Sequence, residues 1–255
     1  MTSEPVTIFC MKWGNKFGPH YVNRLHAMVR RFLQRPHRFV CLTDDGEGLH
    51  PEITVLPLPD MTWNEGIRSW GWWKVGLFSE SEHLGGLTGR ALFLDLDVVI
   101  TGPIDDLFTY PGTILLPRDY RRVRVRGDDY VGNTSVLRFE IGQHVGLMEQ
   151  FRAENPPKNS TLRNEQEYVS RYFHQRGELS YWPSGWCPSF KRHCVRPWPL
   201  SHFLTPRLPE GAKVVVFHGH PNPAEALAGQ SHRWYRPIRP TPWVADYWTE
   251  EPPGA

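Results

Sequence analysis

The chain has 255 residues, 40% of them hydrophobic, and a formal net charge of +2. This is enough apolar material for one large core, and the balanced charge excludes a general requirement for nucleic acid or for a strongly acidic partner. No stretch reaches the ~18 uninterrupted apolar residues of a membrane helix. The N-terminal residues also lack the basic and apolar regions of a signal peptide. We therefore expect a cytoplasmic protein, either free or bound peripherally at the inner membrane surface.

Strand-like and helix-like segments alternate through the first hundred residues. β-Branched and aromatic runs predict strands over 6–13, 37–45, 52–59 and 90–100. Apolar residues at helical spacing predict helices over 21–34 and 69–81. Because several of the strands are continuously apolar, the pattern indicates an α/β sandwich around a mainly parallel, mixed sheet that is buried on both faces.

The second half of the chain continues this pattern less regularly. It predicts strands over 113–119, 133–139, 179–183 and 213–219, and helices over 141–154 and 165–175. The tail from about Arg233 is rich in Pro and Trp, and we expect it to wrap the outside. Since no repeat and no linker interrupts the chain, we expect a single domain over residues 1–255.

The four cysteines allow two interpretations. Cys10 and Cys41 lie in apolar strand-like runs, where buried reduced thiols are common. Cys187, His193 and Cys194 suggest zinc, but no C-x-x-C pair supports a zinc site. Packed, reduced thiols are therefore favoured for all four.

The stretch "ALFLDLDVVI" (91–100) places two acids, Asp95 and Asp97, within an apolar strand-like run. Residues two apart on a strand point to the same side, and ligands of α/β sheets collect at the carboxyl ends of the strands. Paired carboxylates at such an edge suit Mg²⁺ or Mn²⁺ completed by substrate phosphates. The structural alternative is a pair of turn acids or ion-paired residues.

"FLDLDVVI" resembles the D-x-D motif of GT-A-fold glycosyltransferases, and residues 5–220 as a whole resemble the family-8-like branch. The resemblance implies a GT-A-type, Rossmann-like αβα sandwich. Its nucleotide-binding half would span roughly 5–125 and its donor-sugar and acceptor half 126–232, followed by the tail over 233–255. It also implies a divalent ion, Mn²⁺ or Mg²⁺, on Asp95 and Asp97 that holds the diphosphate of a nucleotide-sugar donor.

"VVVFHGH" (214–220) is similar to the late H-G segment of that family, whose histidine is a further metal ligand. The matching residue is His218; taken alone, a histidine at a strand end is more simply a hydrogen-bonding residue. The lysine that follows in the family is absent here. His220 is the candidate to replace it at the donor phosphate.

Two further segments resemble family elements beside the donor sugar. "YVGNTSVLRF" matches at Asn133, and "NEQEYVSRYF" matches at Glu165 and Gln166, with Glu165 in place of the usual Asp. The resemblance makes Asn133, Glu165 and Gln166 the candidate catalytic residues. The structural alternative for Glu165 is an acid that stabilises a helix N-terminus.

Further candidates for contacts with the nucleotide-sugar are basic or lie after the first strand. Lys74 precedes the D-x-D and resembles the basic residue that reaches the donor; a solvated lysine is the alternative. Met11, Lys12 and Trp13 occupy the place where the family binds the nucleoside base; the alternative is that they belong to an ordinary glycine-containing loop.

Two basic regions remain. The arginines in 118–129 could steer an anionic donor, an anionic acceptor or an acidic membrane surface, although a solvated ion-paired face is the simpler interpretation; they are Arg118, Arg121, Arg122, Arg124 and Arg126. The aromatic and basic segment 181–194 is a candidate lining of the acceptor side, or packs structurally.

Together these features predict a metal-dependent transfer of a sugar from a nucleotide-diphosphate donor to a hydroxyl acceptor. The expected donor is a UDP-sugar. The acceptor would be a glycan, a lipid-linked molecule or a small molecule. The resemblance implies retention of configuration, which front-face attack achieves without a nucleophile. No nucleic acid is expected, and weak association with a membrane surface is left open. The alternatives are a haloacid-dehalogenase-type phosphatase using Asp95 and Asp97, and a non-enzymatic Trp-rich carbohydrate-binding module.

Overall fold

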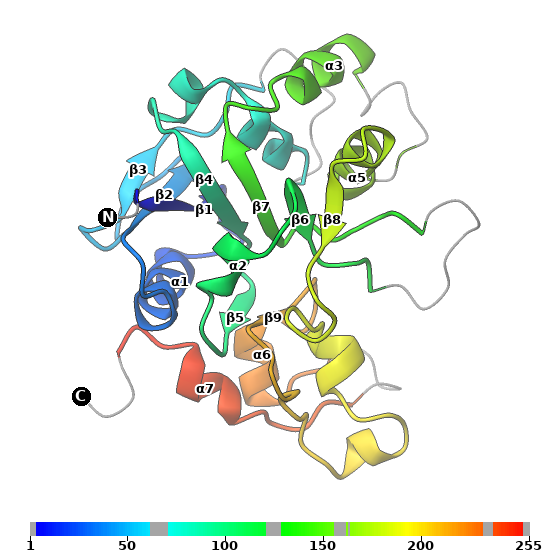
Figure 1. The fold of residues 1–255 in the computed structure, drawn as a ribbon. Helices are drawn as coiled ribbons and strands as arrows, with labels where there is room; N and C mark the ends of the chain where they lie inside the picture. Colours follow the sequence, from blue (N-terminus) through cyan, green and yellow to red (C-terminus); the bar gives the residue numbers. More distant parts are fainter. Residues whose placement is uncertain are drawn as a thin grey trace.

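A computed structural model describes residues 4–61, 71–120, 129–155, 162, 164–231 and 237–251. At its centre is a seven-stranded sheet in the order β3-β2-β1-β4-β7-β6-β8 (Figure 1). Strands β1 to β4 and the pair β6–β8 run parallel, whereas β7 is antiparallel to β4 and β6. The predicted α/β fold with a mainly parallel, mixed sheet is confirmed. The strands are β1 (Val6–Lys12), β2 (His37–Thr43), β3 (Thr54–Leu56), β4 (Gly89–Leu94), β6 (Ile114–Leu116), β7 (Val136–Ile141) and β8 (Leu179–Tyr181).

Helices cover both faces of this sheet (Figure 1). The longer ones are α1 (Pro19–Phe32), α3 (Gly146–Glu154) and α5 (Glu165–Gln175). The shorter ones are η1 (Trp72–Phe78), η2 (Ser81–Leu84), α2 (Asp106–Thr109), η3 (Phe190–Cys194), η4 (Leu200–His202), α6 (Pro223–Ala228) and α7 (Trp243–Tyr247). Among the described helices, none combines the length and the hydropathy needed to cross a membrane.

The sheet separates two hydrophobic cores. Successive side chains of β1 alternate between them, because neighbouring residues of a strand point to opposite faces. Ile8 and Cys10 lie in the core under α1, and Phe9 and Met11 lie in the core under η1, α3 and α5. A strand that is apolar on both faces is the expected sequence signature of such a buried parallel sheet.

The run 90–100 forms two strands, not the single strand that its hydrophobicity predicts. β4 ends at Leu94, and the chain then turns at Leu96 and Asp97 before β5 (Val98–Ile100) begins. The amide of Asp95 still donates to the Ser135 carbonyl oxygen at 3.0 Å, which ends the pairing with the β7 segment. β5 pairs instead with β9 (Val214–Val216) in a separate antiparallel sheet. Asp95 and Asp97 therefore lie in a turn between two sheets.

The predicted helix over 69–81 is a 3₁₀ helix, η1, in its described part. Glycine weakens an α-helix by about 1 kcal/mol relative to alanine, and the segment contains Gly71 and Gly76. Gly76 also packs closely, since a Cβ atom there would lie 2.3 Å from Cβ of Pro59. The spacing of the apolar residues is helical, but the close contact at Gly76 and the two glycines favour a 3₁₀ helix over an α-helix.

The described part of the tail contributes to the core as well as covering it. Trp248 is buried and meets the Tyr21 ring edge-on, with ring centroids 5.1 Å apart. The guanidinium of Arg24 lies 4.0 Å from the centroid of the Trp248 ring. The tail thus fastens onto α1 through an aromatic side chain.

Candidate functional site

The acid pair lies at the carboxyl end of β4, the edge at which α/β sheets bind ligands. The Asp95 side chain is 23% exposed and forms an ion pair, whereas Asp97 forms none with the described residues. Burial, and then the neighbouring charge of Asp95, raise the pKa of Asp97 to about 7. A carboxylate that is costly to ionise beside another carboxylate would be stabilised by a bound cation.

Lys74 supplies positive charge to this edge. Its ammonium lies 2.7 Å from Oδ1 and 2.8 Å from Oδ2 of Asp95, and 3.9 Å from Oε1 of Glu165. Burial disfavours the charged lysine, but the carboxylates of Asp95 and Glu165 outweigh burial and raise the pKa of Lys74. Lys74 is therefore a buried cation of the site and not the solvated lysine of the alternative interpretation.

Glu165 reaches the same place from the first turn of α5. Asn164 caps this helix by accepting a hydrogen bond from the Glu167 amide at 3.2 Å. The Glu165 carboxylate accepts from the Thr134 hydroxyl at 3.1 Å and is buried. It also packs on Gly71, where a Cβ atom would lie 2.2 Å from Oε2 of Glu165.

Asn133 and Gln166 lie beside Glu165 and contact each other. The Asn133 side-chain amide donates to Oε1 of Gln166 at 3.3 Å. Oδ1 of Asn133 accepts from the Ser135 amide at 3.0 Å, which fixes the side chain just before β7. Asn133 is buried and Gln166 half-buried. The structure thus brings Asn133, Glu165 and Gln166 together with Lys74 and Asp95.

His218 follows β9, and its backbone runs beside the acid pair. The β5–β9 register continues into a hydrogen bond from the Phe217 amide to the Asp97 carbonyl oxygen at 3.1 Å. Nε2 of His218 lies 2.7 Å from the Ser189 hydroxyl, and its ring stacks on Tyr120 with centroids 5.3 Å apart. Burial, and then Lys191 and Arg192, lower the pKa of His218 to about 4. The imidazole is therefore neutral at pH 7, the form that ligates metals.

The remaining predicted contacts of the donor are already engaged within the protein. Nζ of Lys12 donates to the Asp45 carbonyl oxygen at 2.8 Å, and Nδ1 of His220 lies 2.9 Å from Oε2 of Glu225. The Met11 side chain lies in the core, which leaves only its backbone for a ligand. Trp13 is half-buried against the same core.

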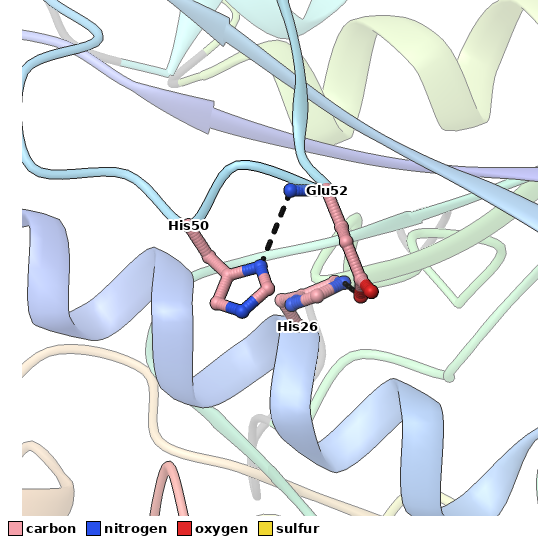
Figure 2. Close-up of side chains that lie close together, drawn as sticks. All are labelled: His26, His50 and Glu52. Carbon is pink, nitrogen blue, oxygen red and sulfur yellow. Dashed lines mark hydrogen bonds and ion pairs between the residues drawn. The ribbon is translucent and has the colours of Figure 1, made fainter.

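Side chains that could hold a metal gather at a second place (Figure 2). His26 of α1, His50 and Glu52 place ligand atoms within 4.8 Å of one another, and they are the one such group within the described ranges. The ligand atoms of Asp95, Asp97 and His218 do not all come this close. In the second cluster, however, Glu52 is already neutralised by the guanidinium of Arg30 at 3.1 Å.

The structure supports the favoured interpretation of the later cysteines as packed thiols, since Cys187, His193 and Cys194 do not gather as a metal-ligating group among the described residues. Cys187 and Cys194 are buried free thiols, and Nδ1 of His193 accepts from the Ser189 amide at 2.9 Å. Burial raises the pKa of both thiols, which keeps them protonated at neutral pH.

Most of the predicted arginine cluster, 121–128, lies outside the described residues. Arg118 stacks over the Tyr181 ring at 3.9 Å.

Sequence reasoning missed three contributors to the site. Thr134 binds Glu165, Gly71 makes room for it, and Ser189 holds the His218 ring. Each is small, and no local pattern marks it, because its partner is distant in the sequence. Only the tertiary structure identifies them.

The central sheet, the acid pair after β4 and the late strand β9 beside it define the class of fold: this is the GT-A fold, in the form that resembles the family-8 glycosyltransferases. The structure is similar to that of the galactosyltransferase LgtC in complex with donor and acceptor sugar analogues, with a TM-score of 0.56 and 14% identity over 85% of this chain and 88% of LgtC. An active-site mutant of LgtC gives the same TM-score and identity over 85% of this chain and 89% of the mutant. No protein-family model and no curated protein matches the sequence.

This fold argues against the phosphatase alternative. In haloacid-dehalogenase-type enzymes the D-x-D follows the first strand, whereas here it follows β4.

Proposed function

We propose that the chain is a retaining, metal-dependent glycosyltransferase that moves a sugar from a nucleotide-diphosphate donor, with a UDP-sugar expected, to a hydroxyl acceptor. One observation carries the proposal. The buried Lys74 joins Asp95 of the acid pair to Glu165, and Glu165 adjoins the Asn133–Gln166 pair, all at the ligand-binding edge of a GT-A sheet. Charged and amide groups converge there from η1, the β4–β5 turn, the segment just before β7 and the start of α5.

Asp95, Asp97 and His218 are the residues that would hold Mn²⁺ or Mg²⁺. Their chemistry fits: the group offers two carboxylates, one of them without an ion-pair partner among the described residues, and a neutral imidazole. A bound ion would supply Lewis acidity to the leaving diphosphate. The His26 cluster, formed by α1 and the loop before β3, is the less suitable site, because Arg30 already pairs with its one carboxylate.

The roles of the other residues follow from their charges and positions. In the proposed reaction the bond from the anomeric carbon to the diphosphate oxygen breaks, and the acceptor oxygen bonds to that carbon on the same face. The acceptor proton passes to the departing diphosphate. In this reaction the Glu165 carboxylate would stabilise the positive charge that develops on the sugar, and the amides of Asn133 and Gln166, which contact each other, would orient the sugar hydroxyls.

A panel of nucleotide-sugars tests this proposal. The protein is incubated with each donor, with and without Mn²⁺, and the release of nucleotide diphosphate is measured. We expect one donor class to be hydrolysed slowly with Mn²⁺ and not without it, and Asp97→Asn to abolish the release. Asp106→Asn is the matched control, because Asp106 is an exposed carboxylate outside the site, paired with Lys213.

Failure of all donors, together with glycan binding that needs neither nucleotide nor metal, would favour the carbohydrate-binding module instead. Release of phosphate from simple phosphate esters would favour a phosphatase. The cytoplasmic location, and the division into halves at roughly 5–125 and 126–232, remain predictions.

A further inference from the structure

One loop departs from the usual distribution of apolar side chains. Among the described residues, four of the large hydrophobic side chains that are strongly exposed lie close together in the sequence: Trp198, Leu200, Phe203 and Leu204. Trp198 is 74% exposed and Phe203 76%. Isolated exposed apolar residues are ordinary, but a contiguous group marks an interaction surface.

The loop is held in this exposed arrangement by its own backbone. We call residues 194–207 the apolar loop; its base is closed by a hydrogen bond from the Arg207 amide to the Cys194 carbonyl oxygen at 2.9 Å. Within it, the amides of Phe203 and Leu204 donate to the Leu200 carbonyl oxygen at 3.0 and 2.9 Å. The Trp243 indole donates to the Pro206 carbonyl oxygen at 3.0 Å and fastens the loop to α7. The apolar side chains are thus presented to the solvent by an ordered scaffold.

Along the sequence, the charged side chains in and beside the apolar loop have one sign. No Asp or Glu occurs between Glu178 and Glu210, and this interval contains Lys191, Arg192, Arg196 and Arg207. Lysine and arginine beside exposed Trp, Phe and Leu are the combination found where proteins rest on anionic lipid: the aromatic side chains enter the interface, and the basic groups meet the headgroups.

The apolar loop adjoins the candidate site. It follows η3 directly, and Lys191 of η3 donates from Nζ to the His218 carbonyl oxygen, while Ser189 just before η3 binds the His218 ring. In Figure 1 the yellow segment that contains the loop projects past β9 and α6 at the bottom of the view.

We propose that the apolar loop docks the protein on a membrane surface that contains anionic phospholipid. Trp198 and Phe203 enter the interfacial layer, and Arg196 and Arg207 lie at the level of the headgroups. Docking holds the His218 end of the site at the membrane, where a lipid-linked acceptor would present its hydroxyl. This last consequence rests on the proposed function; the docking itself does not.

Vesicle sedimentation of the full chain tests the docking without any donor or acceptor. The vesicles contain phosphatidylcholine alone or phosphatidylcholine with phosphatidylglycerol. We expect binding to the anionic vesicles, weakened by added salt, and a decrease of at least about tenfold in Trp198→Ser/Phe203→Ser. Leu227→Ser is the matched control, since Leu227 is an exposed apolar residue of α6 outside the loop, and it should bind as the wild type does.

A second measurement guards against a folding defect. Vesicles with brominated acyl chains should quench the tryptophan fluorescence of the wild type more than that of Trp198→Phe, a milder change. The proposal is overturned if the wild type ignores anionic vesicles, or if the double variant binds them equally well. It is also overturned if the wild type self-associates through this loop, so that the double variant only converts a dimer to a monomer.

Discussion

The ammonium of Lys74 lies 2.7 Å from the carboxylate of Asp95, with both groups at the edge of the sheet. Removing a buried partner leaves the other charge uncompensated. We expect Lys74→Met to lower the free energy of unfolding by about 2 kcal/mol, less than for a fully buried pair because Asp95 is partly exposed. Urea unfolding measures this difference.

The control for Lys74 is an exposed ion pair. Arg171 lies 3.2 Å from Glu154, and Arg171→Met should cost less than about 1 kcal/mol. Lys74→Met combined with Asp95→Asn should recover part of the loss, because the stranded charge is gone. Equal effects of Lys74→Met and Arg171→Met would contradict the role assigned to Lys74.

Gly71 and Glu165 fit each other closely. A Cβ atom at Gly71 would lie 2.2 Å from Oε2 of Glu165, and the backbone of Gly71 is right-handed, so the obstacle is space and not conformation. Gly71→Ala should destabilise the protein by about 1–3 kcal/mol and displace the carboxylate. Glu165→Asp shortens the side chain, so the double variant should lose at least about 0.5 kcal/mol less than the sum of the single losses. Simple additivity in thermal or urea unfolding would show that the two residues are not in contact.

The two places with metal-ligating side chains can be separated by titration. We expect Asp97→Asn to weaken Mn²⁺ binding, measured by calorimetry, by at least about tenfold, because it removes a carboxylate ligand. His50→Ala should leave Mn²⁺ binding unchanged. The reverse pattern would place the ion on His26, His50 and Glu52.

His26 should make stability depend on pH. Burial, and then the neighbouring His50, lower the pKa of His26 from 6.5 to about 4. The charge of Glu52 opposes this shift, and those of Arg30 and His37 add to it. The unfolded chain therefore binds a proton more readily than the native protein between these values. The contribution of His26 is complete above pH 6.5 and is lost as the pH falls toward about 4.

The free energy of unfolding is measured for the wild type and for His26→Leu across that pH range. We expect the wild type to lose about 1–3 kcal/mol more than His26→Leu as the pH falls. The apolar variant keeps the contact with Phe39 and should show a flatter profile. Parallel profiles for the two proteins would contradict the assignment.

The central strands were predictable because their signal is local. β1, β2 and β4 are runs of β-branched and aromatic residues buried on both faces, and no other element satisfies that pattern as simply. The amphipathic spacing of α1 and α5 was equally clear. The GT-A form followed from the D-x-D together with the late histidine segment, and the fold comparison confirms it.

What the sequence could not disclose depends on contacts between distant segments. The turn at Asp97 arises because β5 pairs with β9 and not with the central sheet, and hydrophobicity does not distinguish the two pairings. The ion pair of Lys74 with Asp95 joins η1 to the β4–β5 turn, and a lone lysine in a sequence carries no sign of its partner. The exposure of the apolar loop was also hidden, because Trp, Leu and Phe in a sequence are expected in a core, and only the exposed fractions of Trp198 and Phe203 show otherwise. The neighbouring segment 181–194 stays a candidate lining of the acceptor side.

The pairing of β5 with β9 also constrains the order in which the protein matures. β5 is made early in synthesis, whereas β9, its strand partner within the described residues, lies more than a hundred residues later, so closing that contact is a slow, non-local step. A nascent chain can complete the β3-β2-β1-β4 half of the central sheet while the acid pair still lacks the β9 backbone that runs beside it. The proposed metal and donor site should therefore be completed last, only after the chain has emerged beyond His218.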